Sequence, residues 1–249
     1  MNKAELEICC PNWRSAQAAE QAGAHRIELC SSLSEGGITP SAGLIQQCVN
    51  ELSIHVHVLI RARAGDFLYS EEELAIMRKD VVFCKEQGVD GVVFGFLNTD
   101  GSINIERTRE FVALAHPMKT TFHRAFDRCA QPFLALEELI ALKIDYILTS
   151  GQKATALEGA SMIRQLVKKA KGRVKMMAGS GVRTHLLAEL MRKTKAPAYH
   201  LSSRIEIESA MQYRESEVSM GSQSPKKEQL IISQDIHNLQ EARRILDEY

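Results

Sequence analysis

The sequence predicts a single (β/α)8 barrel, also called a TIM barrel. Strand-like apolar segments alternate with helix-like segments eight times along 249 residues, and polar residues stand where the strands end. Both the number of units and the length match this barrel, whose functional groups lie at the C-terminal ends of the strands. An open doubly wound sheet usually has a glycine-rich turn after its first strand, and Cys10-Pro11-Asn12-Trp13 is not that turn.

Apolar periodicity and capping residues place the elements. The strands are expected at residues 6–10, 25–30, 54–60, 91–95, 120–123, 144–149, 174–178 and 199–202. The helices are expected at residues 13–21, 41–52, 70–87, 105–115, 133–142, 155–169, 184–193 and 228–249. Ser70 and Glu73 form a capping-box pattern, and Gly88 ends that helix. The polar stretch 204–227 is predicted to be an extended loop at the barrel mouth or a partly disordered segment, within one domain that spans residues 1–249.

Composition excludes two broad classes of partner. The chain has 31 basic and 31 acidic side chains, so it lacks the basic excess of proteins that bind nucleic acid or membrane surfaces. No apolar run approaches the ~20 residues of a membrane span, and the charged N-terminus does not resemble a signal peptide. The six scattered cysteines are expected to be reduced thiols, which predicts a cytoplasmic protein.

Alternation along the strands assigns the side chains that face the barrel interior. Because Leu6 and Ile8 are taken to face the helices, the residues between and after them face inward. The inward-facing set is Glu7, Cys9, Glu28, Cys30, His57, Arg61, Thr121, His123, His200 and Ser202. A buried charge costs several kcal/mol unless it is paired. One interpretation is therefore that Glu7, Glu28 and Arg61 form internal salt bridges that plug the barrel.

The other interpretation is a ligand site. Glu7, Glu28 or His123 would then transfer protons, and Arg61 would hold an anionic group of the ligand. His123 could also be a metal ligand. Further candidate ligand-binding residues lie in the segments after the third and fifth strands and on the last strand: Arg63, Asp66, Arg124 and His200.

Small residues after the later strands indicate a candidate phosphate site. Gly179-Ser180-Gly181 follows the seventh strand, and Ser202 ends the eighth. Barrels often bind phosphate with these two loops, where small residues allow the backbone to approach an anion. Ser150 after the sixth strand could contribute. The alternative is that these glycines only serve tight turns with positive φ.

Sulfur gives a weaker signal for a metal site. Cys9 and Cys30 lie on neighbouring strands about 4.8 Å apart, so both could bind one soft ion. Cys10 follows Cys9 directly in the strand and should face the opposite side. No C-x-x-C motif or histidine tract is present.

Several of these motifs resemble the CutC family. They are Leu6-Glu7-Ile8-Cys9-Cys10, Glu28-Leu29-Cys30, Gly36-Gly37-Ile38-Thr39-Pro40-Ser41, Arg61-Ala62-Arg63-Ala64-Gly65-Asp66-Phe67, Thr121-Phe122-His123-Arg124-Ala125-Phe126-Asp127, Leu148-Thr149-Ser150-Gly151 and Ala178-Gly179-Ser180-Gly181-Val182. The resemblance extends from the first strand to Met220-Gly221. One departure is Ala62, which stands where the family commonly has proline.

The resemblance implies a cytoplasmic TIM-barrel protein that forms a dimer or higher oligomer and serves copper homeostasis. It also implies Cys9, Cys10 and Cys30 as candidate ligands for Cu(I), with no organic cofactor. Two hypotheses follow. The first is a Cu(I)-binding protein that uses these thiolates. The second is a TIM-barrel enzyme, or a binder of a small phosphorylated or carboxylated metabolite, that uses the Glu and His residues as acid–base groups.

Overall fold

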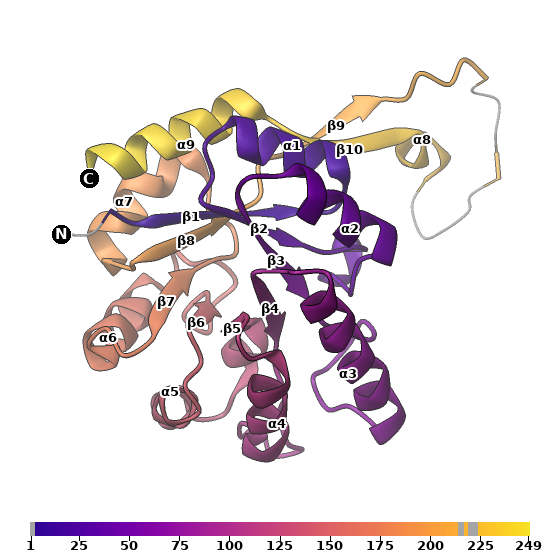
Figure 1. Cartoon of the computed structure of the whole chain (residues 1–249). Helices are drawn as coiled ribbons and strands as arrows, with labels where there is room; N and C mark the ends of the chain where they lie inside the picture. The colour runs from indigo at the N-terminus through magenta and orange to yellow at the C-terminus, as the bar shows by residue number, and fades with distance from the viewer. Residues whose placement is uncertain (1–2, 214–216, 219–223) are drawn as a thin grey trace.

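The computed structural model, which describes residues 3–213, 217–218 and 224–249, contains the predicted barrel. Eight parallel strands close in the order β1 to β8, and β8 pairs with β1. The barrel strands are β1 (Glu5–Cys10), β2 (Arg26–Leu29), β3 (His55–Leu59), β4 (Gly91–Phe94), β5 (Lys119–Phe122), β6 (Tyr146–Thr149), β7 (Lys175–Ala178) and β8 (Ala198–Leu201). Two more strands, β9 (Arg204–Glu208) and β10 (Leu230–Gln234), form a separate antiparallel pair (Figure 1).

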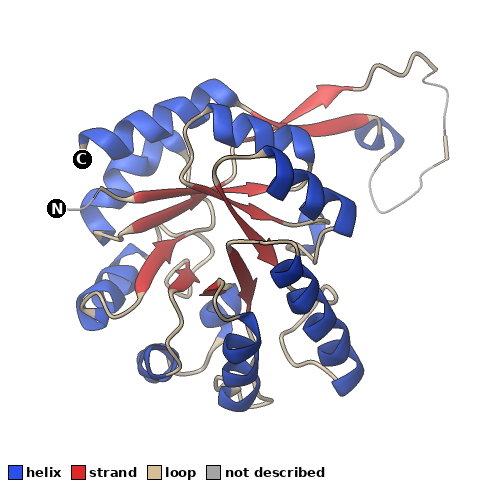
Figure 2. Cartoon of the chain, viewed as in Figure 1, coloured by secondary structure: helices blue, strands red, loops and turns tan. Residues whose placement is uncertain are grey.

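Helices surround the strands as an outer ring (Figure 2). The ring consists of α1 (Trp13–Gln21), α2 (Ala42–Glu51), α3 (Glu71–Glu86), α4 (Ile105–Ala115), α5 (Pro132–Ala141), α6 (Ala160–Ala170), α7 (Thr184–Thr194) and α9 (Ile236–Glu248). The short helix α8 (Pro225–Glu228) lies outside the ring, beside the projecting β10 (Figure 1). Short 3-10 turns, η1 (Leu33–Glu35) and η2 (Arg124–Arg128), follow β2 and β5. Among the described residues, no helix combines the length and the apolar character that crossing a membrane requires.

Strand alternation separates two apolar regions, as predicted. Leu6, Ile8 and Cys10 are fully buried in the main core between strands and helices. Cys9 and Cys30 belong instead to a smaller cluster inside the barrel, together with Leu59 and Val93. All six cysteines are free thiols, and all are buried.

Helix starts follow the capping residues. The Ser70 side chain accepts a hydrogen bond from the Glu73 N–H, and the Glu73 carboxylate accepts one from the Ser70 N–H, so the predicted capping box is present. One helix start was predicted wrongly: α6 begins at Ala160, five residues later than expected. Gly159 stands just before this start, and it packs so closely that a Cβ there would lie 1.9 Å from the Ser150 carbonyl oxygen.

The predicted loop over residues 204–227 was wrong for the residues of β9 and α8, and the predicted closing helix is present but begins at Ile236, eight residues later than expected. β9 and β10 pair with Ile207 opposite Ile231, and α8 lies between them. The C-terminal helix α9 begins only after Asp235, whose side chain accepts the Asn238 N–H. Alternating isoleucines and charged residues in β9 carried this strand signal. Residues 214–216 and 219–223 of the predicted loop lie outside the described residues.

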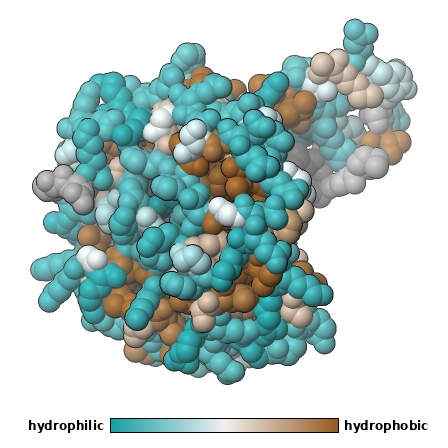
Figure 3. All heavy atoms as spheres, viewed as in Figure 1, coloured by the Kyte–Doolittle hydropathy of each residue, from teal (hydrophilic) through white to brown (hydrophobic). Residues whose placement is uncertain are grey.

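The β9–β10 hairpin projects from the barrel, but its base is anchored beside β1 (Figure 1). Gln234 Nε2 donates to the Cys9 carbonyl oxygen at 2.9 Å, and Asn12 Nδ2 donates to the Ile232 carbonyl oxygen at 2.9 Å. On the face in Figure 3, hydrophilic side chains cover most of the helices, with apolar patches between them. The hairpin therefore holds the end of β1, where the candidate site begins.

Candidate functional site

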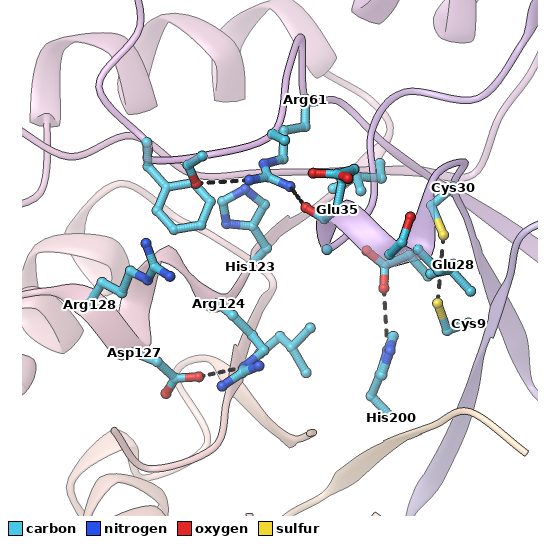
Figure 4. Close-up of a pocket in the computed structure, with 18 residues that line it drawn as sticks. Cys9, Glu28, Cys30, Glu35, Arg61, His123, Arg124, Asp127, Arg128 and His200 are labelled. Atoms are coloured by element: carbon cyan, nitrogen blue, oxygen red, sulfur yellow. Dashed lines mark hydrogen bonds and ion pairs between the residues drawn. The ribbon is translucent and has the colours of Figure 1, made fainter. Parts of the chain in front are cut away.

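A cavity of about 480 Å³ opens at the C-terminal ends of the strands. Its wall combines residues from β1, β2, β8, the loop after β3, and the 3-10 turns η1 and η2. Figure 4 shows two groups within it: Cys9, Cys30, Glu28 and His200 lie on one side, and Arg124, Asp127 and Arg128 lie on the other. Arg61 and His123 stand between these groups. The volume falls in the range of pockets for small molecules, about 300–1,000 Å³.

Two thiols meet at one side of the cavity. Cys9 Sγ lies 3.6 Å from Cys30 Sγ. Contact with the Cys30 thiol, together with burial, raises the pKa of Cys9 well above its usual value. Ligand atoms of Cys9, Glu28 and His200 all lie within 4.8 Å of one another, which is close enough to hold one metal ion. Cys10 is excluded from this group, because it is fully buried in the core on the helix side of β1.

Glu28 and His200 form an ionisable pair beside the thiols. Glu28 Oε2 lies 3.4 Å from His200 Nδ1, and the same nitrogen lies 2.6 Å from Glu7 Oε1. Burial raises the pKa of Glu28 to about 7, against the opposing charge of His200. Burial alone would lower the pKa of His200, but contacts with Cys9 and Glu7 and the charge of Glu28 raise it. This pair could exchange protons with a ligand in the cavity.

Glu7 faces inward as predicted, but it is 1% exposed and lies beneath the cavity. Arg26 binds it from below, with Arg26 Nε donating to Glu7 Oε2 at 2.5 Å and Nη1 donating to Glu5 Oε2 at 2.7 Å. The charges of Arg26 and His200 outweigh burial and hold the pKa of Glu7 well below its usual value. Glu7 is thus an anion inside a salt-bridge network, a poor fit to the predicted proton-transfer role.

The predicted salt bridges between Glu7, Glu28 and Arg61 are not what the barrel contains. Glu7 pairs with Arg26, and Glu28 faces His200 in the cavity wall. Arg61 is 5% exposed and donates to backbone oxygens of Glu35 at 2.9 Å, Gly37 at 2.7 Å and Gly65 at 2.9 Å. It therefore holds two loops of the mouth together, and its charge faces the cavity.

His123 also lines the cavity and is 5% exposed. Its Nδ1 accepts the Ala125 N–H at 3.1 Å, and its ring packs against Phe67 with 4.8 Å between centroids. Burial, helped by the charge of Arg61, lowers the pKa of His123 to about 3. A ring that is neutral down to acidic pH is poorly suited to the predicted role of general base.

The turn η2 places three charged residues at the cavity rim. Arg124 Nε donates to Asp127 Oδ2 at 2.8 Å, and Arg124 Nη2 donates to Ser150 Oγ at 3.0 Å. Asp127 also accepts the backbone N–H groups of Ser150 and Gln152. Asp127 thereby fixes η2 to the loop after β6. Ser150 takes part in this contact, but it is not among the described residues that line the cavity.

Arg63 and Asp66 lie away from the cavity, contrary to their predicted role as ligand-binding residues. Arg63 Nη2 donates to Asp66 Oδ1 at 3.0 Å, and Arg63 Nε donates to Glu73 at the start of α3. The Asp66 side chain is 68% exposed. These residues tie the loop after β3 to α3.

The predicted phosphate cradle lies outside the cavity wall formed by the described part of the chain, which includes neither Ser202 nor the turn 179–181. A Cβ on Gly179 would lie 2.4 Å from Leu148 Cδ1, and Gly181 has φ +64°. Ser180 Oγ donates to the Ala154 carbonyl oxygen at 2.8 Å. The alternative interpretation, glycines that serve a tight turn, accounts for these observations.

The sequence patterns did not single out two arginines of the barrel interior. Arg26 is buried at 3% exposure, and Arg128 lines the cavity. Strand alternation could have found Arg26, because it lies two residues before Glu28 and so faces the same side. No such periodic signal exists for Arg128, whose position depends on the 3-10 turn.

Comparison with known proteins identifies one family. The family model described as the CutC family matches residues 4–205. The copper homeostasis protein cutC homolog of Homo sapiens is 44% identical over 216 residues, which cover 87% of this chain and 79% of that protein. The family protein CutC of Parabacteroides distasonis is 43% identical over 245 residues, which cover 98% of each chain.

Solved structures agree on the fold. The CutC structure from Streptococcus agalactiae superposes with a TM-score of 0.75 at 30% identity, covering 79% of this chain and 97% of that one. Phosphoribosylanthranilate isomerase from Thermotoga maritima superposes with a TM-score of 0.59 at 12% identity, covering 99% of this chain and 100% of that one. The second likeness concerns the barrel fold alone.

Proposed function

The chain belongs to the CutC family, and from this premise we propose that it serves copper homeostasis by binding Cu(I) through Cys9 and Cys30. The observation that carries the proposal is the 3.6 Å separation of the two sulfur atoms inside the cavity. Metal–thiolate bonds of about 2.3 Å, as for zinc, place two sulfurs on one ion about 3.8–4.0 Å apart. Small side-chain shifts would therefore admit an ion. Soft thiolates are the ligands that Cu(I) prefers.

His200 is the best placed third ligand. A ring nitrogen of His200 and a carboxylate oxygen of Glu28 lie within 4.8 Å of Cys9 Sγ. Imidazole suits copper better than a hard carboxylate does. His200 must be neutral to bind the metal, so it would give up a proton on binding. Cys10 is left out of the proposed ligand set, because it faces the helices.

Binding must displace protons. The raised pKa of Cys9 means that its thiol is protonated at neutral pH, and metal binding requires the thiolate. A reducing compartment such as the cytoplasm, which we propose as the location, would keep both thiols available. The homo-oligomer expected from the family resemblance stays a prediction, which light scattering of the purified protein would test.

An anaerobic Cu(I) titration against a competing chelator tests the proposal. The native chain should bind Cu(I) tightly and in a fixed ratio, and a Cys9→Ser/Cys30→Ser double variant should not. The matched control is Cys48→Ser/Cys84→Ser, which also removes two buried thiols, in helices away from the cavity. Cu(I) binding that survives in the first double variant would contradict the proposal.

A second candidate function is acid–base catalysis on a small phosphorylated or carboxylated metabolite. The favouring observation is Glu28, a carboxyl group in the cavity wall whose pKa is raised to about 7 beside His200. A group that titrates near the working pH can both take up and release a proton. The acid–base pair would then be Glu28 and His200, in place of Glu7 and His123.

Glu28→Gln separates the two candidates. The amide cannot transfer a proton, but it leaves Cys9, Cys30 and His200 in place. We expect the variant to retain Cu(I) binding. If the native protein depletes a compound from a mixture of sugar phosphates and carboxylic acids and Glu28→Gln does not, the second candidate gains support. Equal depletion by both proteins would exclude a catalytic role for Glu28.

A further inference from the structure

On the cavity side that faces the thiols, Arg61 and Arg128 form no ion pair with a described carboxylate. Glu35 and Asp127 also line the cavity, and Asp127 is paired with Arg124. Arg61 is 5% exposed, and its guanidinium donates only to backbone oxygens of two loops. Within the described part of the chain, no carboxylate oxygen lies within 4.0 Å of it. A buried cation without a counter-ion is costly. An anion in the cavity would supply the missing charge.

His123 adds a hydrogen-bond donor that lacks an acceptor. A backbone N–H can only donate, so His123 Nδ1, which accepts the Ala125 N–H, must be unprotonated in the neutral ring. The ring proton is therefore on Nε2. This atom is buried and has no hydrogen-bond partner among the described residues. Because His123 lines the cavity, a ligand oxygen there could accept a hydrogen bond from this N–H group.

Arg128 completes the cationic side. Its guanidinium carbon lies 5.8 Å from the centre of the Phe67 ring, and Figure 4 shows the side chain at the cavity. Arg124, four residues earlier, is paired with Asp127 at 2.8 Å. Arg128 has no such pair with any described carboxylate, so it is available to a ligand.

We propose that the cavity receives Cu(I) as a complex with a small thiol that carries carboxylate groups. The copper and sulfur of this complex would lie at Cys9 and Cys30, and its carboxylates at Arg61, His123 and Arg128. The proposal rests on the proposed Cu(I) function and adds the class of carrier. A cavity of about 480 Å³ is far larger than one ion requires, which a bound carrier would explain. The thiol side of the cavity would bind the soft metal ion of the complex, and the arginine side would bind its carboxylates.

Transfer of the ion is a ligand exchange without electron transfer. The copper bond to the Cys9 sulfur forms as the copper bond to the carrier sulfur breaks. The proton that Cys9 loses goes to the departing thiolate, so the carrier leaves as a neutral thiol group. The same exchange at Cys30 releases a second carrier thiol where two are bound. Copper remains Cu(I) throughout.

Two carriers that differ in one charge provide the test. N-acetylcysteine has a carboxylate, and N-acetylcysteine amide has a neutral amide in its place. Anaerobic uptake of Cu(I) from each carrier is measured for the native chain and for Arg128→Gln, Arg128→Lys and Arg109→Gln. Arg109 is an exposed arginine of α4, so its variant has the same net charge as Arg128→Gln with an intact cavity.

We expect native protein and Arg109→Gln to take up Cu(I) roughly tenfold more readily from the carboxylated carrier, the size of one charge-assisted hydrogen bond. Arg128→Gln should lose most of this preference, and Arg128→Lys should keep part of it. Equal uptake from both carriers by the native chain would overturn the carrier proposal and leave Cu(I) binding standing. Absence of uptake from either carrier, with no thiol-dependent binding in the chelator titration, would instead reject the proposed function itself.

Discussion

Buried charged side chains have different partners at the two ends of the barrel interior. At the closed end, Arg26 bridges Glu5 and Glu7 at 2.7 and 2.5 Å, and its guanidinium lies 4.0 Å from the Tyr146 ring centre. At the mouth, Arg61 donates only to backbone oxygens, and Glu28 has no arginine partner among the described residues. At the closed end the arginine is paired with carboxylates, whereas at the mouth Arg61 has no carboxylate partner among the described residues.

Two carboxylates on neighbouring strands make the contrast quantitative. The charges of Arg26 and His200 outweigh burial and lower the pKa of Glu7, while burial raises the pKa of Glu28 to about 7. Both side chains are buried, so exposure does not distinguish them. The two carboxylates differ in their partners, because Glu7 pairs with Arg26 and Glu28 has no arginine partner in the described part of the chain. The Arg26 pair therefore stabilises the charged form of Glu7, and the charged form of Glu28 lacks this stabilisation.

The largest expected effect is on stability at the closed end. Arg26→Met leaves His200 as the remaining cationic partner of Glu7 and Lys175 as that of Glu5, and it should cost roughly 3–5 kcal/mol of unfolding free energy. Arg128→Met at the mouth should change it by less than about 0.5 kcal/mol, because its guanidinium is exposed. Urea unfolding of both variants measures the difference. Similar losses in the two proteins would remove the distinction between the ends.

A medium effect is expected from Glu28→Gln in the metal-free protein, and it should depend on pH. Because the pKa of Glu28 is about 7 in the folded state and its usual value is 4.5, the folded state binds more protons between these two pH values. The native protein therefore loses stability as the pH rises from 4.5 to 7. The variant should be more stable than native by about 2 kcal/mol at pH 8, with little difference at pH 4. A gain that is equal at both pH values would contradict the raised pKa.

The smallest effect is expected from Glu5→Gln. Burial would raise the pKa of Glu5, but hydrogen bonding from Lys175 and the charge of Arg26 lower it overall. Ionised Glu5 thus stabilises the fold above its unfolded pKa of about 4.5, and this contribution is lost as the pH falls below that value. The variant should lose about 1 kcal/mol at pH 7 and come closer to native at pH 3. Chemical unfolding across this pH range would measure it, and parallel curves for the two proteins would contradict it.

Strand alternation explains how much of the site could be predicted. It placed Cys9, Cys30, Glu28, His123 and His200 on the inner face, because side-chain direction in a strand follows from sequence position alone. It could not show that Glu7 lies below the cavity, since depth depends on how the strands are staggered.

The positions of side chains in loops were predicted less well, and the reason is physical. Arg61 and Arg63 are two positions apart, but one lines the cavity and the other pairs with Glu73 on α3. Their directions are set by the backbone path of an irregular segment, which carries no periodicity. Likewise, the pairing of Arg124 with Asp127 depends on the turn η2, and the hairpin of β9 and β10 depends on a partner strand more than twenty residues later.

The pairing of β1 with β8 has a consequence for protein synthesis. Cys9 and Cys30 are made early, but His200 closes the site from a strand 193 residues after Glu7, and Gln234 holds the Cys9 carbonyl later still. At about 5–20 residues per second, a ribosome needs roughly 10–40 s to bridge that interval. During this time the two thiols belong to an open sheet. The cavity wall that Cys9, Glu28 and His200 share is therefore completed late in synthesis, and a chain interrupted before β8 would carry the thiols without His200.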